Sequence, residues 1–139
     1  MEHLTNIVDY GVIGLLIFMS ILSFTFFIER ILFFRKVDIL SFAHIKKLEN
    51  SLTKNLTTIA TIASNAPYIG LLGTVLAIMQ TFIDMGTADI VATKIMSSLA
   101  LALKTTAIGL FVAIAAVVFY NILSRKVEIF LAEYESEKV

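Results

Sequence analysis

Lys104 is the residue whose presence is hardest to explain by packing alone. It interrupts the apolar stretch 95–124, nine residues past Ile95, which corresponds to about 14 Å along a helix. If this stretch crosses a membrane, an ionisable group at that depth is costly and generally functional, although snorkelling or neutrality are alternatives. Glu29 and Asp84 lie at the ends of their apolar stretches, and no carboxylate is expected deeper. The counter-charge of a charged Lys104 is therefore expected from another chain or a bound ion.

Three threonines place hydroxyl groups in similar apolar surroundings. Thr74 follows Gly73 in one apolar stretch, and Thr105 and Thr106 follow Lys104 in the next. A threonine inside a helix most often donates to a carbonyl three or four residues earlier. The alternative is a polar lining for a pore or proton path, and these three threonines with Lys104 are its candidate residues.

Small residues recur on one helix face in each of these two stretches. The first set is Ala66, Gly70, Gly73 and Ala77, and the second is Ala102, Thr106, Gly109, Ala113 and Ala116. Small side chains let helix backbones approach closely. We expect a contact between two helices of one chain and, in addition, faces that build an oligomer. Pro67 predicts either a bend in a continuous helix or the first position of a new one.

Other kinds of site lack the residues they need. The chain has no cysteine and only two isolated histidines, so no metal site is expected. The run Gly70-Leu-Leu-Gly73 lacks the downstream Lys-Ser/Thr of a phosphate loop. Eleven basic and eleven acidic residues cancel, which leaves no electrostatic footprint for nucleic acid. We expect neither an enzyme nor a cofactor.

The composition indicates a membrane protein. Hydrophobic residues make up 58% of the 139 and charged residues 16%, against about 45–50% and 25% in soluble domains. A bilayer-spanning helix needs about 20 apolar residues, and lipid offers no partner to exposed backbone groups. We predict one all-α membrane domain, 1–139, with transmembrane helices at about 10–28, 66–84 and 95–123. Because the first ten residues lack Lys and Arg, the first span is expected to be a mature helix rather than a signal peptide.

The distribution of basic residues predicts the orientation. Six Lys and Arg lie in the 29–60 segment and three in the tail 124–139, against Lys94 alone in the 84–94 hairpin. The positive-inside rule therefore places the N-terminus and this hairpin in the periplasm, and the 29–60 segment and the tail in the cytoplasm. The second and third apolar stretches exceed one bilayer thickness, so both helices should extend into the cytoplasm.

The sequences of the expected cytoplasmic segments also predict helices. Asp38 can cap a helix whose apolar residues recur at helical spacing: Ile39, Phe42, Ile45, Leu48 and Leu52. The tail presents one apolar face, formed by Val127, Phe130, Leu131 and Tyr134. Both stripes are expected to pack on neighbouring helices; lying flat on the membrane is the alternative.

Two stretches resemble the ExbB/TolQ/MotA proton-channel family. Residues 65–82 contain Ala66-Pro-Tyr-Ile-Gly-Leu-Leu-Gly-Thr-Val75, which is similar to the second-span signature of that family. Residues 98–121 contain Ala102-Leu-Lys-Thr-Thr-Ala-Ile-Gly-Leu-Phe-Val-Ala-Ile114, which is similar to the third-span signature. The predicted three-span topology matches as well, and the length and loops resemble the ExbB branch.

The resemblance implies a homo-oligomeric ring, pentameric in this family, in the bacterial inner membrane. Spans two and three would line a central pore that holds an ExbD-like single-span partner with an intramembrane aspartate. Protons would be the coupling ion, and the work would reach a TonB-like protein. Thr74 and Thr106 match the family's pore threonines, and Gly70, Gly73 and Gly109 match its close-packing glycines.

Two residues depart from the family pattern. Leu101 stands where many members have a glutamate, and Lys104 lies one turn later on nearly the same side. Ala115 stands where the family usually has proline. The alternatives are a TolQ-like subunit for envelope maintenance and a structural oligomer without proton coupling; a flagellar stator lacks support because its large cytoplasmic region is missing.

Overall fold

The computed structural model describes residues 2–87 and 91–138, and every regular element within these ranges is helical. The elements are α1 (Glu2–Lys36), the 3-10 helix η1 (Ile39–Ser41), α2 (Ile45–Leu52), α3 (Leu56–Thr87) and α4 (Ala92–Lys138). Residues 88–90 of the predicted 84–94 hairpin lie outside the described residues, as do the two terminal ones. Over the described ranges, α1, α3 and α4 are long and apolar enough to cross a membrane, which confirms the prediction of three spans.

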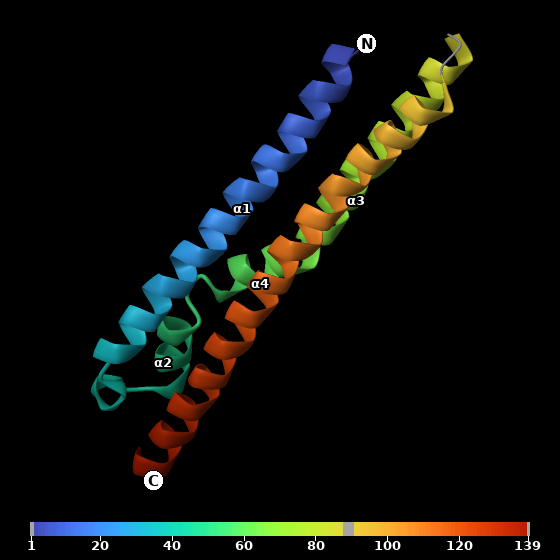
Figure 1. The fold of residues 1–139 in the computed structure, drawn as a ribbon. Helices are drawn as coiled ribbons and strands as arrows, with labels where there is room; N and C mark the ends of the chain where they lie inside the picture. Colours follow the sequence, from blue (N-terminus) through green and yellow to red (C-terminus); the bar gives the residue numbers. More distant parts are fainter. Residues whose placement is uncertain (1, 88–90, 139) are drawn as a thin grey trace.

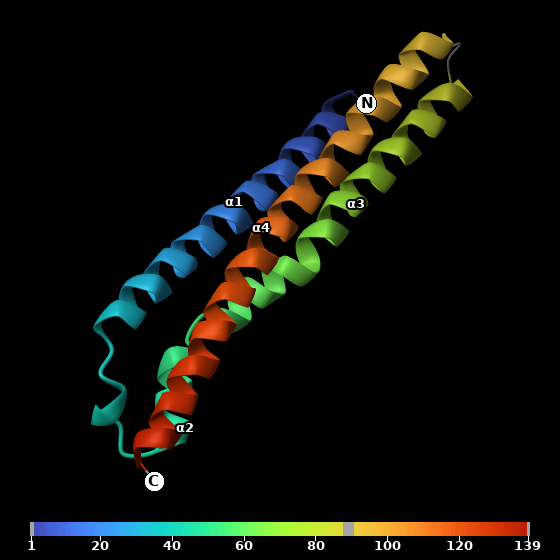
Figure 2. The same cartoon turned by 60° about the horizontal axis from the view of Figure 1, so that its bottom comes forward.

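The three long helices lie alongside one another as an elongated bundle (Figure 1, Figure 2). Helices α1 and α4 run in the same direction, and α3 runs in the opposite one. The N-terminus therefore lies at the end of the bundle where α3 ends and α4 begins, as Figure 1 shows. The C-terminus and α2 lie at the other end. The expected periplasmic and cytoplasmic segments thus lie at opposite ends of the molecule.

The core of the bundle is a narrow stripe along each helix. On α1 the buried residues recur at intervals of three, four or seven: Leu16, Met19, Ser23, Arg30 and Phe34. Such spacing keeps one helix face turned toward its neighbours. Most of the remaining surface carries large exposed apolar side chains, Phe18, Leu71 and Phe111 among them. A helix with an apolar outer face suits a lipid environment.

Helices α3 and α4 are longer than a bilayer requires. Helix α4 has 47 residues, or about 70 Å, while a hydrocarbon core is about 30 Å thick. Both helices therefore continue well beyond any membrane-spanning part. The positions of the membrane surfaces, at the predicted span boundaries, stay a prediction.

Pro67 lies inside α3 rather than at its start. The helix begins at Leu56 and passes through Pro67 without a break. The alternative of a helix that starts at Pro67 is therefore wrong. The ring removes one N–H, so the carbonyl of Ala63, four residues earlier, loses its usual helical donor. A bend at this position stays a prediction.

The segment after Asp38 forms two helices, not the one that was predicted. Asp38 does cap a helix, because its side chain accepts from the N–H of Leu40 at 3.2 Å, but this helix is η1 and ends at Ser41. The chain is extended at Phe42 and His44 before α2 begins. The hydroxyl of Tyr134 donates to the Phe42 carbonyl at 2.9 Å. This bond from α4 supplies a donor that a continuous helix would otherwise have provided.

The apolar stripes of α2 and the α4 tail are packed inside the bundle. Leu48 and Leu52 of α2 are buried, as are Val127 and Tyr134 of α4. The ring of Phe130 meets that of Phe34 on α1 edge-on, with 5.5 Å between centroids. These contacts confirm packing on neighbouring helices.

Candidate functional site

The tightest contact between α3 and α4 is made by two glycines. A Cβ atom added to Gly70 would lie 2.6 Å from the Thr105 carbonyl oxygen, and one added to Gly109 would lie 2.6 Å from the Ala66 carbonyl oxygen. Real Cβ atoms essentially never approach another atom within 3.0 Å. Because both obstacles are backbone atoms, no side-chain rotation could relieve them. Only glycine at both positions permits this close approach of the two helices.

Three threonine side chains meet beside the glycine contact. Thr74 Oγ1 lies 2.8 Å from the Ala102 carbonyl oxygen and 3.2 Å from Thr105 Oγ1, and it also hydrogen-bonds to Thr106 Oγ1. Thr105 Oγ1 lies 3.1 Å from the Gly70 carbonyl oxygen. All three hydroxyls are satisfied if Thr74 donates to Ala102, Thr105 to Gly70 and Thr106 to Thr74. We call these three residues the threonine cluster.

The threonine cluster combines bonds within a helix and bonds between helices. Thr74 and Thr105 also lie within reach of carbonyls of their own helices, at 3.3 Å from Gly70 and 3.0 Å from Ala102. Thr74 is 6% exposed and Thr105 1% exposed, whereas Thr106 is half-buried. Thr106 is therefore the most exposed member of the cluster, although its Oγ1 also lies 3.4 Å from the Gly70 carbonyl oxygen.

The other small residues line the same inner faces. Ala66 and Ala77 of α3 and Ala102 and Ala113 of α4 are buried. A Cβ atom on Gly73 would meet the Thr105 hydroxyl at 2.9 Å and Val12 of α1 at 3.1 Å. All three long helices therefore converge at Gly73. A further contact of these residues with another copy of the chain stays a prediction.

Lys104 lies on the exposed side of α4, next to the threonine cluster. Within the described residues it forms no ion pair shorter than 4.0 Å. It nonetheless acts electrostatically on Asp9, a carboxylate of α1. A counter-charge from another chain or an ion stays a prediction, but the chain itself holds a carboxylate within electrostatic range of Lys104. The predicted first span begins at Tyr10, so Asp9 lies just outside it.

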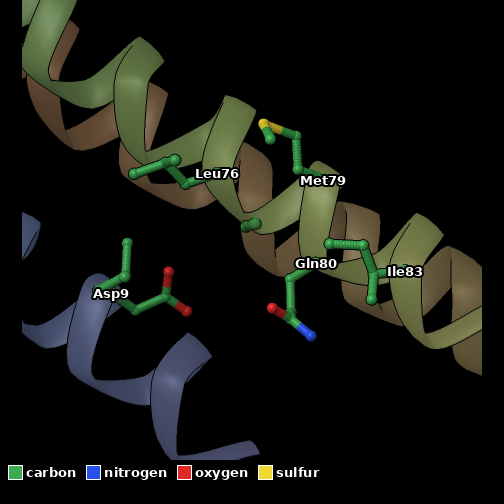
Figure 3. A pocket seen from close by; sticks show the side chains of 7 residues that line it. Asp9, Leu76, Met79, Gln80 and Ile83 are labelled. Atoms are coloured by element: carbon green, nitrogen blue, oxygen red, sulfur yellow. The ribbon is translucent and has the colours of Figure 1, made fainter. Parts of the chain in front are cut away.

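Helical spacing could have revealed Asp9. It lies seven residues before Leu16, which is buried on the inward face of α1, and residues seven apart share a helix face. Figure 3 shows the Asp9 carboxylate and the amide of Gln80 from α3 pointing into one pocket. This pocket has a volume of about 160 Å³ and apolar walls from Leu76, Met79 and Ile83.

Arg30 is a second residue whose position the sequence reasoning missed. It was counted only as a cytoplasmic charge, but its side chain is 2% exposed. Its Nη1 donates to the carbonyl oxygen of Ser51 at 2.7 Å and more weakly to that of Leu52 at 3.4 Å, while Glu29 beside it accepts from Nε and Nη2. Arg30 thus holds the end of α2, where helix carbonyls lack intrahelical donors.

No group of three or more potential metal-ligating side chains occurs among the described residues. The buried polar side chains in the described part of the chain are instead hydroxyls and the Arg30 guanidinium, and Asp9, Gln80 and the exposed Lys104 lie near the threonine cluster's end of the bundle. Such groups can hydrogen-bond water and exchange or accept protons, and they lie along the contacts of the three long helices.

Comparison with known proteins places this arrangement in a family. Residues 38–136 match the MotA/TolQ/ExbB proton channel family. The chain is 53% identical to the biopolymer transport protein ExbB-like 2 of Helicobacter pylori, over 94% of this chain and 87% of that protein. It is 50% identical to the biopolymer transport protein ExbB of Aquifex aeolicus, over 98% and 93%. The Tol-Pal system protein TolQ of Pseudomonas aeruginosa is 40% identical over 65% of this chain but only 39% of its own length.

The ExbB-named relatives of Helicobacter pylori and Aquifex aeolicus are similar to this chain in length, and the family match, residues 38–136, includes the glycine contact and the threonine cluster. This family is one of channels and transport-associated proteins rather than of enzymes. The chain is accordingly a multi-pass membrane protein with an ExbB-type, proton-channel role. It belongs to the MotA/TolQ/ExbB proton channel family as a short, ExbB-like member.

Proposed function

We propose that the chain is the channel-forming subunit of a proton-driven motor in the bacterial inner membrane. Copies of it form a ring, a pentamer by resemblance to the family, with the N-terminus in the periplasm and α2 in the cytoplasm. The ring holds an ExbD-like single-span partner with an intramembrane aspartate. Protons are the only coupling species, and a TonB-like protein carries the work to transport across the outer membrane.

The threonine cluster is the observation that carries this proposal. It joins α3 to α4 at the glycine contact, and Thr106 is its most exposed member in the single chain. A hydroxyl can accept from a protonated carboxyl group and donate to an ionised one. Such a group beside a titrating aspartate can support either protonation state of the partner.

Lys104 gives the proposed site its charge. An ionised partner aspartate would be attracted to the lysine, and a protonated one would not, so proton transfer would tighten and release the contact. Lys104 would act as an electrostatic latch on the partner helix. The exposure of Lys104 in the single chain is what such a contact needs.

An ExbB-type role has more support than a TolQ-type one. The ExbB-named relatives of Helicobacter pylori and Aquifex aeolicus match across 87% and 93% of their own lengths, whereas the match to TolQ of Pseudomonas aeruginosa covers 39% of that protein. A structural oligomer without proton coupling is the other alternative. It would use the glycine contact but would have no need for a lysine beside the threonine cluster.

A complementation experiment tests the proposal. The gene is placed, together with its neighbouring single-span gene, in a host that lacks its own ExbB. Deletion of the gene in its natural host is the converse experiment and should abolish uptake. We expect restored energy-dependent iron–siderophore uptake that is abolished by a protonophore. Rescue of detergent resistance without rescue of uptake would favour the TolQ-type role, and rescue of neither would favour the structural oligomer.

A further inference from the structure

Helices α1 and α4 bring Asp9 and Lys104 to the same level of the bundle. Phe24 and Phe27 of α1 lie against Phe119 of α4, with 6.1 and 4.4 Å between ring centroids. Asp9 lies fifteen residues before Phe24, and Lys104 lies fifteen before Phe119. Because the helices run in the same direction with an equal rise per residue, equal steps end at equal heights. Counted from Phe27 instead, fifteen residues end at Val12, so the two ring contacts place Lys104 level with Asp9 or about one helical turn from it. The electrostatic interaction between the two side chains agrees with this register.

The surroundings of Asp9 leave its charge incompletely satisfied. Its Oδ1 atom is buried and has no hydrogen-bond partner among the described residues. Gln80, which lines the same pocket, donates from Nε2 to Asp84 at 2.9 Å. Among the residues whose side chains the structure describes, Gln80 of α3 shares a pocket with Asp9, Asp84 lies beyond Gln80, and Lys104 of α4 is the cation that acts on Asp9.

Helix geometry directs the stem of Lys104 toward the end of the bundle where α1 and α4 begin. Cα–Cβ bonds in a helix tilt toward its N-terminus, and the N-terminus of α4 lies at the same end as that of α1 (Figure 1). The lysine stem is flexible and can swing its ammonium group by several ångströms. The two groups form no ion pair within 4.0 Å among the described residues, so the ammonium group would have to move to meet either Asp9 or a partner carboxylate.

We propose that Asp9 is a positioning residue that supplies the resting counter-charge of Lys104 and competes for its ammonium group with the carboxylate of a partner helix. In the chain alone, Asp9 offsets the cost of a cation at this depth. When an ionised partner carboxylate arrives, Lys104 moves to it, and when that carboxylate takes a proton, Lys104 returns. The role of Asp9 as resting counter-charge concerns this chain alone, whereas its competition with a partner carboxylate rests on the proposed function.

A double-mutant cycle on the purified chain without partner tests whether Asp9 is the resting counter-charge of Lys104. The variants Asp9→Asn, Lys104→Met and their combination are compared by thermal unfolding in detergent. Both single changes should lower the unfolding temperature, and the double variant should be no less stable than the worse single one. Asp84→Asn combined with Lys104→Met is the matched control, and its effects should add.

A structural contact without charge would behave differently in two further measurements. Asp9→Glu should retain the coupling, because it keeps the carboxylate. The coupling should also vanish at acidic pH, where the carboxylate is protonated, and return at neutral pH. Additive effects of Asp9→Asn and Lys104→Met, or a coupling that persists at acidic pH, would overturn the proposal.

Partner affinity tests the competition. With its resting counter-charge removed, Lys104 should bind the purified ExbD-like partner more tightly in the Asp9→Asn variant, by a factor within the roughly 5–150-fold range of typical couplings. Unchanged affinity in Asp9→Asn would overturn the competition. If the wild-type chain binds no such partner, the proposed function fails, whereas the result of the cycle on the chain alone still decides the role of Asp9.

Discussion

At the scale of single residues, the proposed function depends most on Lys104. It was identified from the sequence because a cation stands out in an apolar stretch. Its neighbour Asp9 was not, because an acidic residue near a predicted helix end reads as solvated. Only the register of α1 against α4 reveals that both approach the same space. A single sequence indicates which face of each helix is buried. It does not indicate how far along its axis a helix lies relative to a neighbouring helix.

Removal of the Lys104 charge should uncouple the motor without dismantling it. Lys104→Met keeps a long apolar stem, so we expect the ring and its partner to co-purify while energised uptake falls at least tenfold. Lys104→Arg should retain part of the uptake, because it keeps the charge. Lys94→Met, at the exposed start of α4, is the control and should leave uptake intact. Normal uptake and normal proton flux in Lys104→Met would contradict the latch.

The hydroxyls of the threonine cluster should matter more for transport than for stability. Thr74→Val and Thr106→Val keep the shape of the side chain, and an interhelical hydrogen bond in a membrane protein contributes about 0.6 kcal/mol on average. We therefore expect intact complexes with depressed uptake, measured with labelled siderophore. Thr81→Val is the matched control, since its hydroxyl bonds to Ala77 of its own helix. Wild-type uptake in both cluster variants would rule out a role for their hydroxyls.

At the scale of helices, the sequence predicted the three long helices, but it predicted a single helix where the structure has η1 and α2. Apolar length specified α1, α3 and α4, and the small residues specified the faces on which α3 and α4 meet. The break between η1 and α2 was missed because no glycine or proline marks it. At this break the Phe42 carbonyl accepts from the Tyr134 hydroxyl, which comes from a residue far along the chain. Local patterns cannot report a hydrogen bond made by a distant segment.

The glycine contact should fail when either glycine gains a side chain. In Gly109→Ala the added methyl would press on the Ala66 carbonyl, and overpacking of this kind costs about 1–3 kcal/mol. Gly109→Leu should separate α3 from α4 and break the oligomer, while membrane insertion persists. Gly14→Leu, where an added Cβ meets nothing within 4 Å of this chain, is the control for the contact inside the chain. Thermal unfolding and size-exclusion chromatography in detergent measure both effects, and an unchanged Gly109→Leu protein would contradict the assignment.

Arg30 should hold the α2 end of the molecule together. Arg30→Met leaves the carbonyls of Ser51 and Leu52 without this donor, and an unsatisfied buried polar group costs about 1–3 kcal/mol. We expect a lower unfolding temperature and faster proteolysis between α1 and α3. Arg35→Met changes an exposed arginine of the same helix and should behave as the wild type. Equal protease resistance of the two variants would show that Arg30 does not anchor α2.

At the scale of the whole molecule, the bundle separates two tasks along its length. One end, with α2 and the α4 tail, is a packed layer of apolar stripes held by Arg30 and Tyr134. The other end carries the glycine contact, the threonine cluster, Lys104 and Asp9. In the proposed orientation the first end lies in the cytoplasm and the second in the membrane. A rigid cytoplasmic layer would fix the helices while the charge near the pore changes.

Proton flux into liposomes tests the central claim most directly. The chain is reconstituted with its ExbD-like partner, a pH gradient is imposed, and an enclosed dye reports the internal pH. We predict a flux that requires both proteins and is lost when the intramembrane aspartate of the partner is changed to asparagine. A flux that is equally fast with that aspartate removed, or no flux from a complex that assembles correctly, would contradict the account.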